Sequence, residues 1–281
     1  MKRQSKRKKD KKKFIAMLVA SVSIMSFLTF KTTVSILKDY ERQDNVITIG
    51  NVDLEIEESH FPTATPILSA GSRIPKDPVV KNTGSNDEYV FLKVSIPKRN
   101  VTLLYEENET PSYPERRGKP AYNPERAEVE IFKTIVEPGS EGDKVSISGE
   151  SDAPGLKRVI NYRKGDSNTS KAGWVFLGKI DGSTTDDYYF GYNKRLLPKD
   201  GADGQTNALF DYVQLKSFIE GELSSGTTAN VDVTVTAYGV QADELGIYGL
   251  PSGTGVLTDS QVKSIFDVVK NKQGITGTLT K

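Results

Sequence analysis

The sequence predicts an all-β fold, a β-sandwich with long loop insertions that ends in one short helix. Three observations lead to this fold class. Segments rich in β-branched and aromatic residues recur with alternating polarity, turns rich in Gly, Asn and Pro separate them, and a helical periodicity appears only after residue 257. With 281 residues, 36% of them hydrophobic, the chain is long enough to bury a sizeable core.

Residues 1–35 are expected to form a hydrophobic signal peptide or signal anchor. The first thirteen residues hold nine Lys or Arg and one Asp, and the segment from Phe14 to Phe30 carries no charge. Its length lies between that of a signal-peptide core and that of a membrane-spanning helix, so cleavage and retention both stay open. The basic residues should stay in the cytoplasm while the remainder is exported. The candidate cleavage site lies between Ser35 and Ile36.

Charge and cysteine content exclude several classes of function. The whole chain has a net charge of +1. Its first thirteen residues carry a larger positive charge than this, so the remaining residues together have a net negative charge. An acidic body does not suit a nucleic-acid backbone, so no nucleic-acid partner is expected. The absence of cysteine excludes disulfides, thiolate metal sites and cysteine nucleophiles.

Residues 36–257 are predicted to form the β-domain, which begins with a strand that has one acidic face. In this strand Val52, Leu54 and Ile56 alternate with three acidic residues. Strict alternation of this kind is typical of a half-buried strand. The next β-unit has Val79–Val80, a turn over 81–86 rich in Asn, Gly and Ser, and a strand from Tyr89 to Ile96. Two strands folded about this turn should lie together.

The middle of the chain is predicted to combine insertions and short strands. Residues 106–128 hold four prolines and many charges, which is typical of a mobile insertion. A strand is expected over 129–133, and the turn-rich segment 139–173 should contain short strands at 145–148 and 158–162.

An aromatic hairpin and one long strand follow. Residues 174–178 and 186–194 should pair around Asp181-Gly182-Ser183, because Asp-Gly favours a hairpin turn. The tyrosines could bind sugars or bases, but cross-strand aromatic packing is the favoured interpretation. Residues 230–242 alternate as a clear strand.

Residues 258–281 are predicted to form a short helix and a polar tail. Thr258 to Gln261 fits a capping box, and apolar residues then recur with the spacing of one helix face: Val262, Ile265, Phe266 and Val269. This stripe should pack against the sheet or cover one of its edges.

No catalytic, cofactor-binding or metal-binding residue is predicted. His60 is the only histidine, so the two-histidine motif of a zinc peptidase is absent, and no nucleophile-elbow sequence accompanies it. Residues 200–205 imitate part of a calcium loop but lack its alternating acidic ligands, so a plain turn is the favoured interpretation.

The segment from Gly71 to Val90, GSRIPKDPVVKNTGSNDEYV, resembles the core signature of the TasA/camelysin (CalY) family, whose members depend on the alternative SipW-type signal peptidase of Gram-positive bacteria. Similar segments begin at Thr48, Trp174, Thr206 and Ala237 and extend the resemblance from about residue 40 to about residue 245. The resemblance implies a jelly-roll-like sandwich, a secreted or cell-surface location, and association with the fibres of a biofilm matrix. Family members usually carry a different sequence at the cleavage site.

These observations lead to the expectation of an exported, non-enzymatic matrix protein that self-associates into fibres by β-strand exchange. The candidate donor is the segment from Lys38 to Glu58, with the donor-strand residues Val46, Ile47, Ile49, Val52, Leu54 and Ile56. The first three would fill a groove of a neighbouring copy, while residues 52–56 would stay in their own sheet. A signal peptidase and, before cleavage, the membrane would be its partners during export. Two alternatives stay open: a membrane-anchored binding or adhesion module, which would use the 106–128 insertion and the tyrosine hairpin, and a camelysin-like peptidase.

Overall fold

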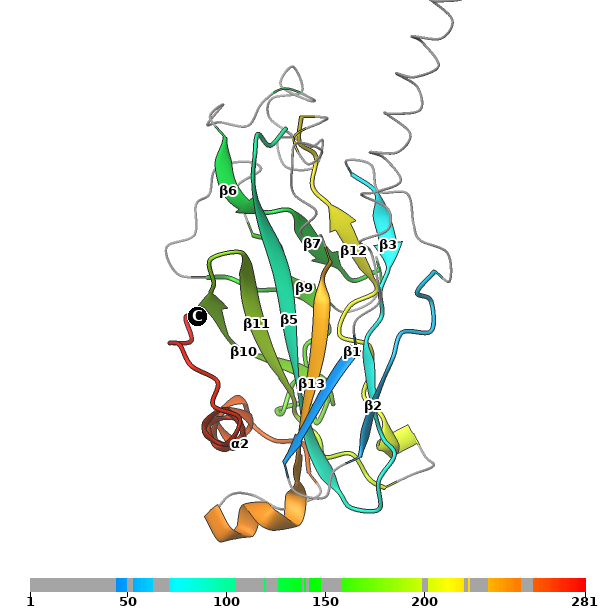
Figure 1. The fold of residues 1–281 in the computed structure, drawn as a ribbon. Coiled ribbons are helices and arrows are strands. Elements are labelled where there is room, and N and C mark those ends of the chain that lie inside the picture. Colours follow the sequence, from blue (N-terminus) through cyan, green and yellow to red (C-terminus); the bar gives the residue numbers. More distant parts are fainter. Residues whose placement is uncertain are drawn as a thin grey trace, which may run out of the picture.

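The fold is organised around β5 (Glu88–Val101), the longest strand of the largest sheet. This strand pairs antiparallel with β13 (Thr234–Gln241) on one side and with β11 (Thr185–Tyr192) on the other, while its far end pairs with β6 (Ala127–Glu130). The outer strands are β10 (Trp174–Asp181), next to β11, and β1 (Asp44–Ile49), next to β13. The resulting six-stranded sheet is strongly curled (Figure 1).

The computed structural model describes residues 44–49, 53–62, 71–104, 119, 126–137, 139, 142–147, 158–198, 202–219, 222, 232–248 and 255–281. The predicted signal segment, the cleavage site at Ser35 and Ile36, the donor residue Val52 and most of the 106–128 insertion lie outside these ranges. In β1 the backbone alone is described. No helix among the described residues is long and apolar enough to cross a membrane.

Three smaller antiparallel sheets accompany the large one. Their strands are β3 (Arg73–Pro75), β12 (Tyr212–Leu215) and β7 (Phe132–Ile135) in that order, the pair β2 (Leu54–Glu57) and β4 (Val79–Asn82), and the pair β8 (Asp143–Lys144) and β9 (Asn161–Tyr162). Two short 3-10 segments, η2 (Ala202–Gly204) and η3 (Ala242–Tyr248), complete the elements that precede the C-terminal helix.

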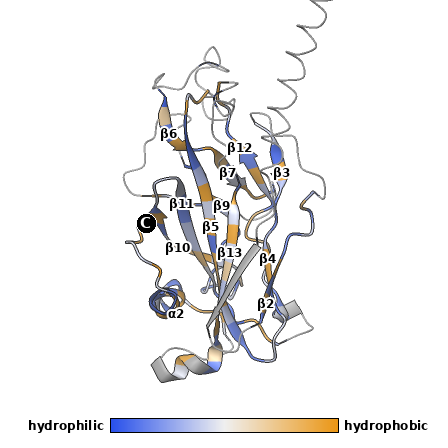
Figure 2. Ribbon diagram, in the orientation of Figure 1, coloured by the Kyte–Doolittle hydropathy of each residue, from blue (hydrophilic) through white to orange (hydrophobic). Residues whose placement is uncertain are grey.

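The main core joins the large sheet to the smaller ones. It collects apolar side chains from one face of β5, β11 and β13 and from β7 and β12, including Leu92, Phe132, Phe190, Val213 and Val235. Each of these side chains is essentially inaccessible to solvent. Apolar residues recur along β5 and β13 (Figure 2), as a half-buried or fully buried strand requires.

A second core forms where α2 (Asp259–Lys272) covers the other face of the large sheet. The predicted stripe of Val262, Ile265, Phe266 and Val269 is fully buried there. Thr258 is the N-cap, and both hydrogen bonds of the predicted capping box are present. Because this helix buries the second face, β13 is buried on both sides rather than half-exposed, as Tyr238 and Val240 show.

The predicted mostly β fold with a single helix near the end of the chain is therefore confirmed, and several elements match closely. The strand expected over Tyr89–Ile96 is the centre of β5, and the aromatic hairpin is β10 and β11. Gly182 in its turn keeps φ outside the left-handed region, but a Cβ there would lie 2.3 Å from the carbonyl oxygen of Thr185. Close approach, rather than a left-handed backbone, requires this glycine.

Other predictions were wrong because strand partners are chosen at long range. The turn over 81–86 does not join paired strands: β4 pairs with β2, whereas β5 enters the large sheet. The side chain of Asn82 fixes this turn by accepting from Gly84 N and donating to the carbonyl of Asn86. The strand expected over 129–133 is split at Ile131, because β6 pairs with β5 and β7 pairs with β12.

The short strands of the 139–173 segment also differ from expectation. The strand predicted at 145–148 is replaced by β8, which ends at Lys144, and the one predicted at 158–162 is reduced to β9. Val145 and Ile147 still pack into the main core, and the N–H of Val145 donates to the carbonyl of Ile160 at 2.8 Å. This bond continues the pairing of β8 with β9 by one residue beyond Lys144.

Candidate functional site

The end of the large sheet at β1 contains three of the six predicted donor residues, Val46, Ile47 and Ile49. All six residues of β1 pair in parallel with β13, from Asp44 opposite Val235 to Ile49 opposite Val240. Val46 lies opposite Ala237, and Ile47 lies opposite Tyr238. The predicted donor residues of this strand thus pair with the chain's own β13.

β13 is the strand that β1 covers, and it presents a continuous apolar surface. Val235 and Ala237 face the main core, whereas Tyr238 and Val240 belong to the core under α2. All four side chains are at most 4% exposed. If β1 were removed, the outer N–H and C=O groups of β13 would become an open edge beside buried apolar residues.

The chain is anchored just after β1 by the backbone of Asp53. Its N–H donates to Oε1 of Glu88 at 3.2 Å, and its carbonyl accepts from N and Oγ1 of Thr83 at 2.9 and 3.1 Å. β2 then begins at Leu54 and pairs with β4, which places Ile56 in the main core. The predicted donor residues Leu54 and Ile56 therefore belong to a strand fixed to its own chain.

Glu88 is an unusual residue for this position because its side chain is fully buried. Burial raises the pKa of its carboxyl to about 7, although the hydrogen bond from Asp53 N–H opposes this rise. Oε2 of Glu88 has no hydrogen-bond partner among the described residues. The carboxyl therefore favours its protonated form more strongly than an exposed glutamate does.

The opposite end of the large sheet, at β10, is closed by other segments of the chain. Lys179 and Thr280 exchange two backbone hydrogen bonds of 2.8 and 2.9 Å. Trp174 donates to Arg163 O and accepts from Gly165 N, both at 3.0 Å. The two ends of the sheet are thus different: a separate strand covers β13, and loop and tail segments cover β10.

Among the residues that the structure describes, His60 does not form a Ser-His-Asp triad. Its Nδ1 lies 2.6 Å from Oδ2 of Asp77, and Oγ of Ser59 lies 3.4 Å from the same nitrogen. A triad needs the acid and the nucleophile on opposite ring nitrogens. Here Ser59 also donates to Asp77, and the ring is 77% exposed, so the group links the end of β2 to the segment before β4.

The aromatic hairpin is packed inside the protein, which supports the packing interpretation of its tyrosines. Tyr188, Tyr189 and Tyr192 are at most 6% exposed. Rings pack in tilted or edge arrangements across strands, as for Trp174 and Tyr192 with centroids 5.2 Å apart. These rings present no open stacking surface to a sugar or base.

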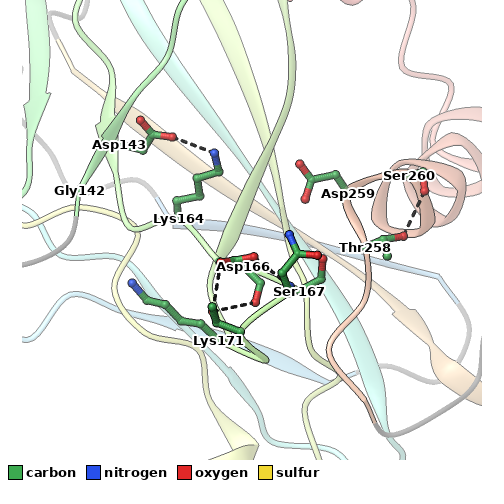
Figure 3. A pocket seen from close by; sticks show the side chains of 12 residues that line it. Gly142, Asp143, Lys164, Asp166, Ser167, Lys171, Thr258, Asp259 and Ser260 are labelled. Carbon is green, nitrogen blue, oxygen red and sulfur yellow. Dashed lines mark hydrogen bonds and ion pairs between the residues drawn. The ribbon is translucent and has the colours of Figure 1, made fainter.

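A polar pocket of about 1040 Å³ lies between the N-terminus of α2 and the loops around β8 and β9 (Figure 3). Asp143 and Lys164 form an ion pair of 3.1 Å on one side. The side chain of Thr258 is engaged in the capping box on the other side. Among the described residues no group of three or more His, Cys, Asp or Glu side chains is arranged to hold a metal ion.

The structure adds residues that the sequence did not single out. Asp53, Thr83 and Glu88 anchor the chain between β1 and β2, and Thr280 covers β10. The only local signal for the anchor is the turn-rich segment 81–86 that precedes Glu88.

Comparisons with protein-family models, with curated proteins and with solved structures find no match for this chain.

Proposed function

We propose that this chain is an exported, non-enzymatic protein of the extracellular matrix or cell surface that assembles into fibres by β-strand exchange. β1 is the donor strand, and β13 of a neighbouring copy is the acceptor. One observation carries the proposal: a separate six-residue strand near the predicted N-terminus of the exported chain covers six of the eight residues at the edge of β13, from Val235 to Val240.

Exchange is energetically accessible because the same contacts form within one chain or between two. The backbone pairing of β1 with β13 is identical in both arrangements, so the difference in free energy is restricted to the connection between β1 and β2 and to the entropy of association. Each copy would give one strand and receive one. This head-to-tail geometry has no closed two-fold symmetry, and it extends into a filament when the rotation between copies does not close.

The hydrogen bonds at Asp53 support different roles for the two strands of the predicted donor segment. Hydrogen bonds from Thr83 and to Glu88 hold Asp53 against the β4–β5 turn. β2 therefore stays in its own copy through its pairing with β4, and β1 is the part that moves. The covered edge of β10 supports growth through β13 alone.

The finer arrangement that we propose is a jelly-roll-like β-sandwich. The chain leaves one sheet and enters another at the β4–β5 turn and again at Ile131. The main core lies between the large sheet and the smaller sheets that these two crossings connect. The resemblance to the TasA/camelysin family supports the same arrangement. It also supports export through the basic and apolar N-terminal segment, with a SipW-type signal peptidase as the processing partner.

Sedimentation and electron microscopy of purified protein test the proposal. A chain that starts at Ile36 should form filaments, and an excess of a peptide with the sequence of residues 44–56 should stop their growth by occupying β13. A peptide with the same composition in scrambled order is the control. A chain from Ile36 that stays monomeric at high concentration, or filaments that grow equally with either peptide, would contradict strand exchange.

N-terminal sequencing of material from culture supernatant and cell envelope tests export. A start at Ile36 in sedimenting material supports a processed fibre subunit. An intact N-terminus confined to the membrane fraction would contradict the free fibre and leave an anchored surface module.

A further inference from the structure

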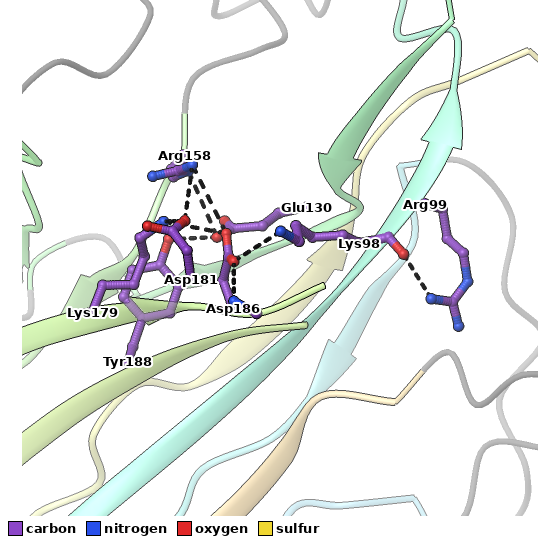
Figure 4. Close-up of polar contacts among 9 residues, drawn as sticks. Lys98, Arg99, Glu130, Arg158, Lys179, Asp181, Asp186 and Tyr188 are labelled. Carbon is purple, nitrogen blue, oxygen red and sulfur yellow. Dashed lines mark hydrogen bonds and ion pairs between the residues drawn. The ribbon is translucent and has the colours of Figure 1, made fainter. Parts of the chain in front are cut away.

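A cluster of charged side chains lies at the turn end of the β10–β11 hairpin, on the face that points toward β6 (Figure 4). Lys179 and Asp181 belong to β10, and the residues opposite them in β11 are Tyr188 and Asp186. Because directly opposite residues share a face of the sheet, these four side chains project to the same side. Glu130, at the end of β6, meets them there.

Three members of this cluster are shielded from solvent. The side chains of Lys179 and Asp186 are 0% exposed, and that of Glu130 is 1% exposed. Nζ of Lys179 lies 3.3 Å from Oδ2 of Asp186 and also donates to Asp181. An amine and a carboxyl are therefore held in contact where water does not compete.

The other oxygen of Asp186 is held by two hydrogen-bond donors. Oδ1 accepts from the backbone N–H of Gly182 at 3.3 Å and pairs with Nζ of Lys98 at 3.2 Å. When a nucleophile adds to a carboxyl carbon, negative charge develops on the oxygen that remains. Fixed donors at that oxygen stabilise the charge without reorganisation, as in an oxyanion hole.

Glu130 supplies a proton within reach of Asp186. Both carboxyls lie beside the guanidinium of Arg158. Oε1 of Glu130 accepts from the hydroxyl of Tyr188 at 2.6 Å, and Oε2 of Glu130 has no hydrogen-bond partner among the described residues. Burial raises the pKa of Glu130 to about 7. Burial opposes ionisation of Asp186 too, but the neighbouring carboxyl of Glu130 and the charges of Lys179 and Lys98 lower its pKa. Glu130 is thus the acid and Asp186 the acceptor.

We propose that Lys179 and Asp186 condense into an intramolecular amide after folding, with Glu130 as the catalytic acid. Nζ of Lys179 transfers one proton to Oδ2 of Asp186 and attacks Cγ, which forms the N–C bond. The C–Oδ2 bond then breaks, Glu130 gives the departing oxygen its second proton, and water leaves. The nitrogen releases its own second proton to Glu130, which returns to its starting state. The ammonium and carboxylate together lose one water molecule, so atoms and charge balance without another reactant.

Arg158 and Tyr188 are positioning residues in this scheme. Nη2 of Arg158 lies 3.9 Å from Oδ2 of Asp186, and its Nε lies 3.8 Å from Oε1 of Glu130. The amide would join β10 to β11 covalently across the hairpin, in a chain that has no cysteine for a disulfide. Closing this loop would limit the freedom of the unfolded chain, as other cross-links do.

Tryptic digestion of the denatured wild-type protein followed by mass spectrometry tests the proposal. An amide removes the charge that trypsin recognises, so cleavage after Lys179 should be lost. The digest should contain one peptide of residues 172–194 that is lighter than its sequence by one water, with no backbone fragments between Lys179 and Asp186. Two peptides of unmodified mass, 172–179 and 180–194, would overturn the proposal, as would fragmentation that places the link at Asp181.

Two variants and an internal control test whether amide formation needs Glu130 or follows from burial of a lysine beside a carboxyl. Glu130→Gln keeps the size of the side chain but removes its transferable proton, and Lys179→Arg keeps the positive charge. Both variants should form no amide, so their tryptic peptides should have the full mass of their sequences, while circular dichroism shows a folded protein. Lys76 is the internal control, because its Nζ is also buried beside a carboxyl, 2.8 Å from Oε1 of Glu58, at a site that does not include Glu130. An amide that survives Glu130→Gln, or one that also forms at Lys76, would overturn the role of Glu130.

Discussion

The ring of Phe266 in α2 packs against that of Phe91 in β5, with centroids 5.4 Å apart and planes inclined by 45°. The same ring lies 5.4 Å from Tyr189 of β11 and is fully buried. One side chain therefore fastens the helix to two neighbouring strands of the large sheet.

Truncation of this ring should destabilise the protein strongly. We expect Phe266→Ala to lower the free energy of unfolding by about 3–5 kcal/mol, because it removes a buried aromatic side chain and leaves a cavity under α2. Urea denaturation provides the measurement. Lys263→Ala, on the exposed face of the same helix, is the control and should change stability by less than about 0.5 kcal/mol. Equal effects of the two changes would show that α2 does not depend on this contact.

The turn of the aromatic hairpin should not tolerate a side chain at Gly182. A Cβ at this position would lie 2.3 Å from the carbonyl oxygen of Thr185, which is backbone and cannot move aside freely. We expect Gly182→Ala to lower the free energy of unfolding by roughly 1–3 kcal/mol. Gly246→Ala is the matched control, since nothing lies within 4 Å of the added atom. A Gly182→Ala protein as stable as this control would be inconsistent with the turn described.

Protonation of Glu88 should make stability depend on pH. Burial raises its pKa from 4.5 to about 7 in the folded chain, so between these values the unfolded chain has released a proton that the folded chain retains. The contribution of Glu88 to stability is therefore complete below pH 4.5 and is lost as the pH rises to about 7. Its upper limit is about 3 kcal/mol.

The variant Glu88→Gln isolates the pH-dependent contribution of Glu88 to the free energy of unfolding, because glutamine does not titrate. Relative to wild type, its free energy of unfolding should increase between pH 4.5 and pH 8 by up to about 3 kcal/mol. Glu55→Gln, at an exposed position of β2, removes a charge without burial and should show no such trend. Curves of wild type and Glu88→Gln that stay parallel over this range would refute the assignment.

The parts of the fold that follow local rules could be predicted from the sequence. The helix begins at its capping box and buries its apolar stripe, since both signals lie within a few residues of one another. The aromatic hairpin follows from Asp-Gly between two strands. The break at Ile131 could not be predicted, because it exists only where β6 and β7 join different sheets through partners far along the chain.

The candidate sites, like the fold, could be predicted only where the signal lies within a short stretch of sequence. The β1 segment is visible as an apolar run near a predicted cleavage site, but its position beside β13 depends on residues almost two hundred positions away. Glu88 and Glu130 were missed because glutamate in a sequence usually indicates a solvated surface, and only the fold shows that both are buried. The contact of Glu130 with Tyr188 spans 58 positions.

Disulfide trapping between different molecules tests strand exchange most directly. Val46 of β1 lies opposite Ala237 of β13, and the chain has no cysteine of its own, so Val46→Cys and Ala237→Cys can be placed in separate proteins and mixed. Strand exchange should give disulfide-linked dimers of one variant with the other under assembly conditions, and far fewer when either variant is present alone. If the mixture gives no such dimers while a protein carrying both changes closes its disulfide within one chain, β1 remains on its own β13 and strand exchange is contradicted.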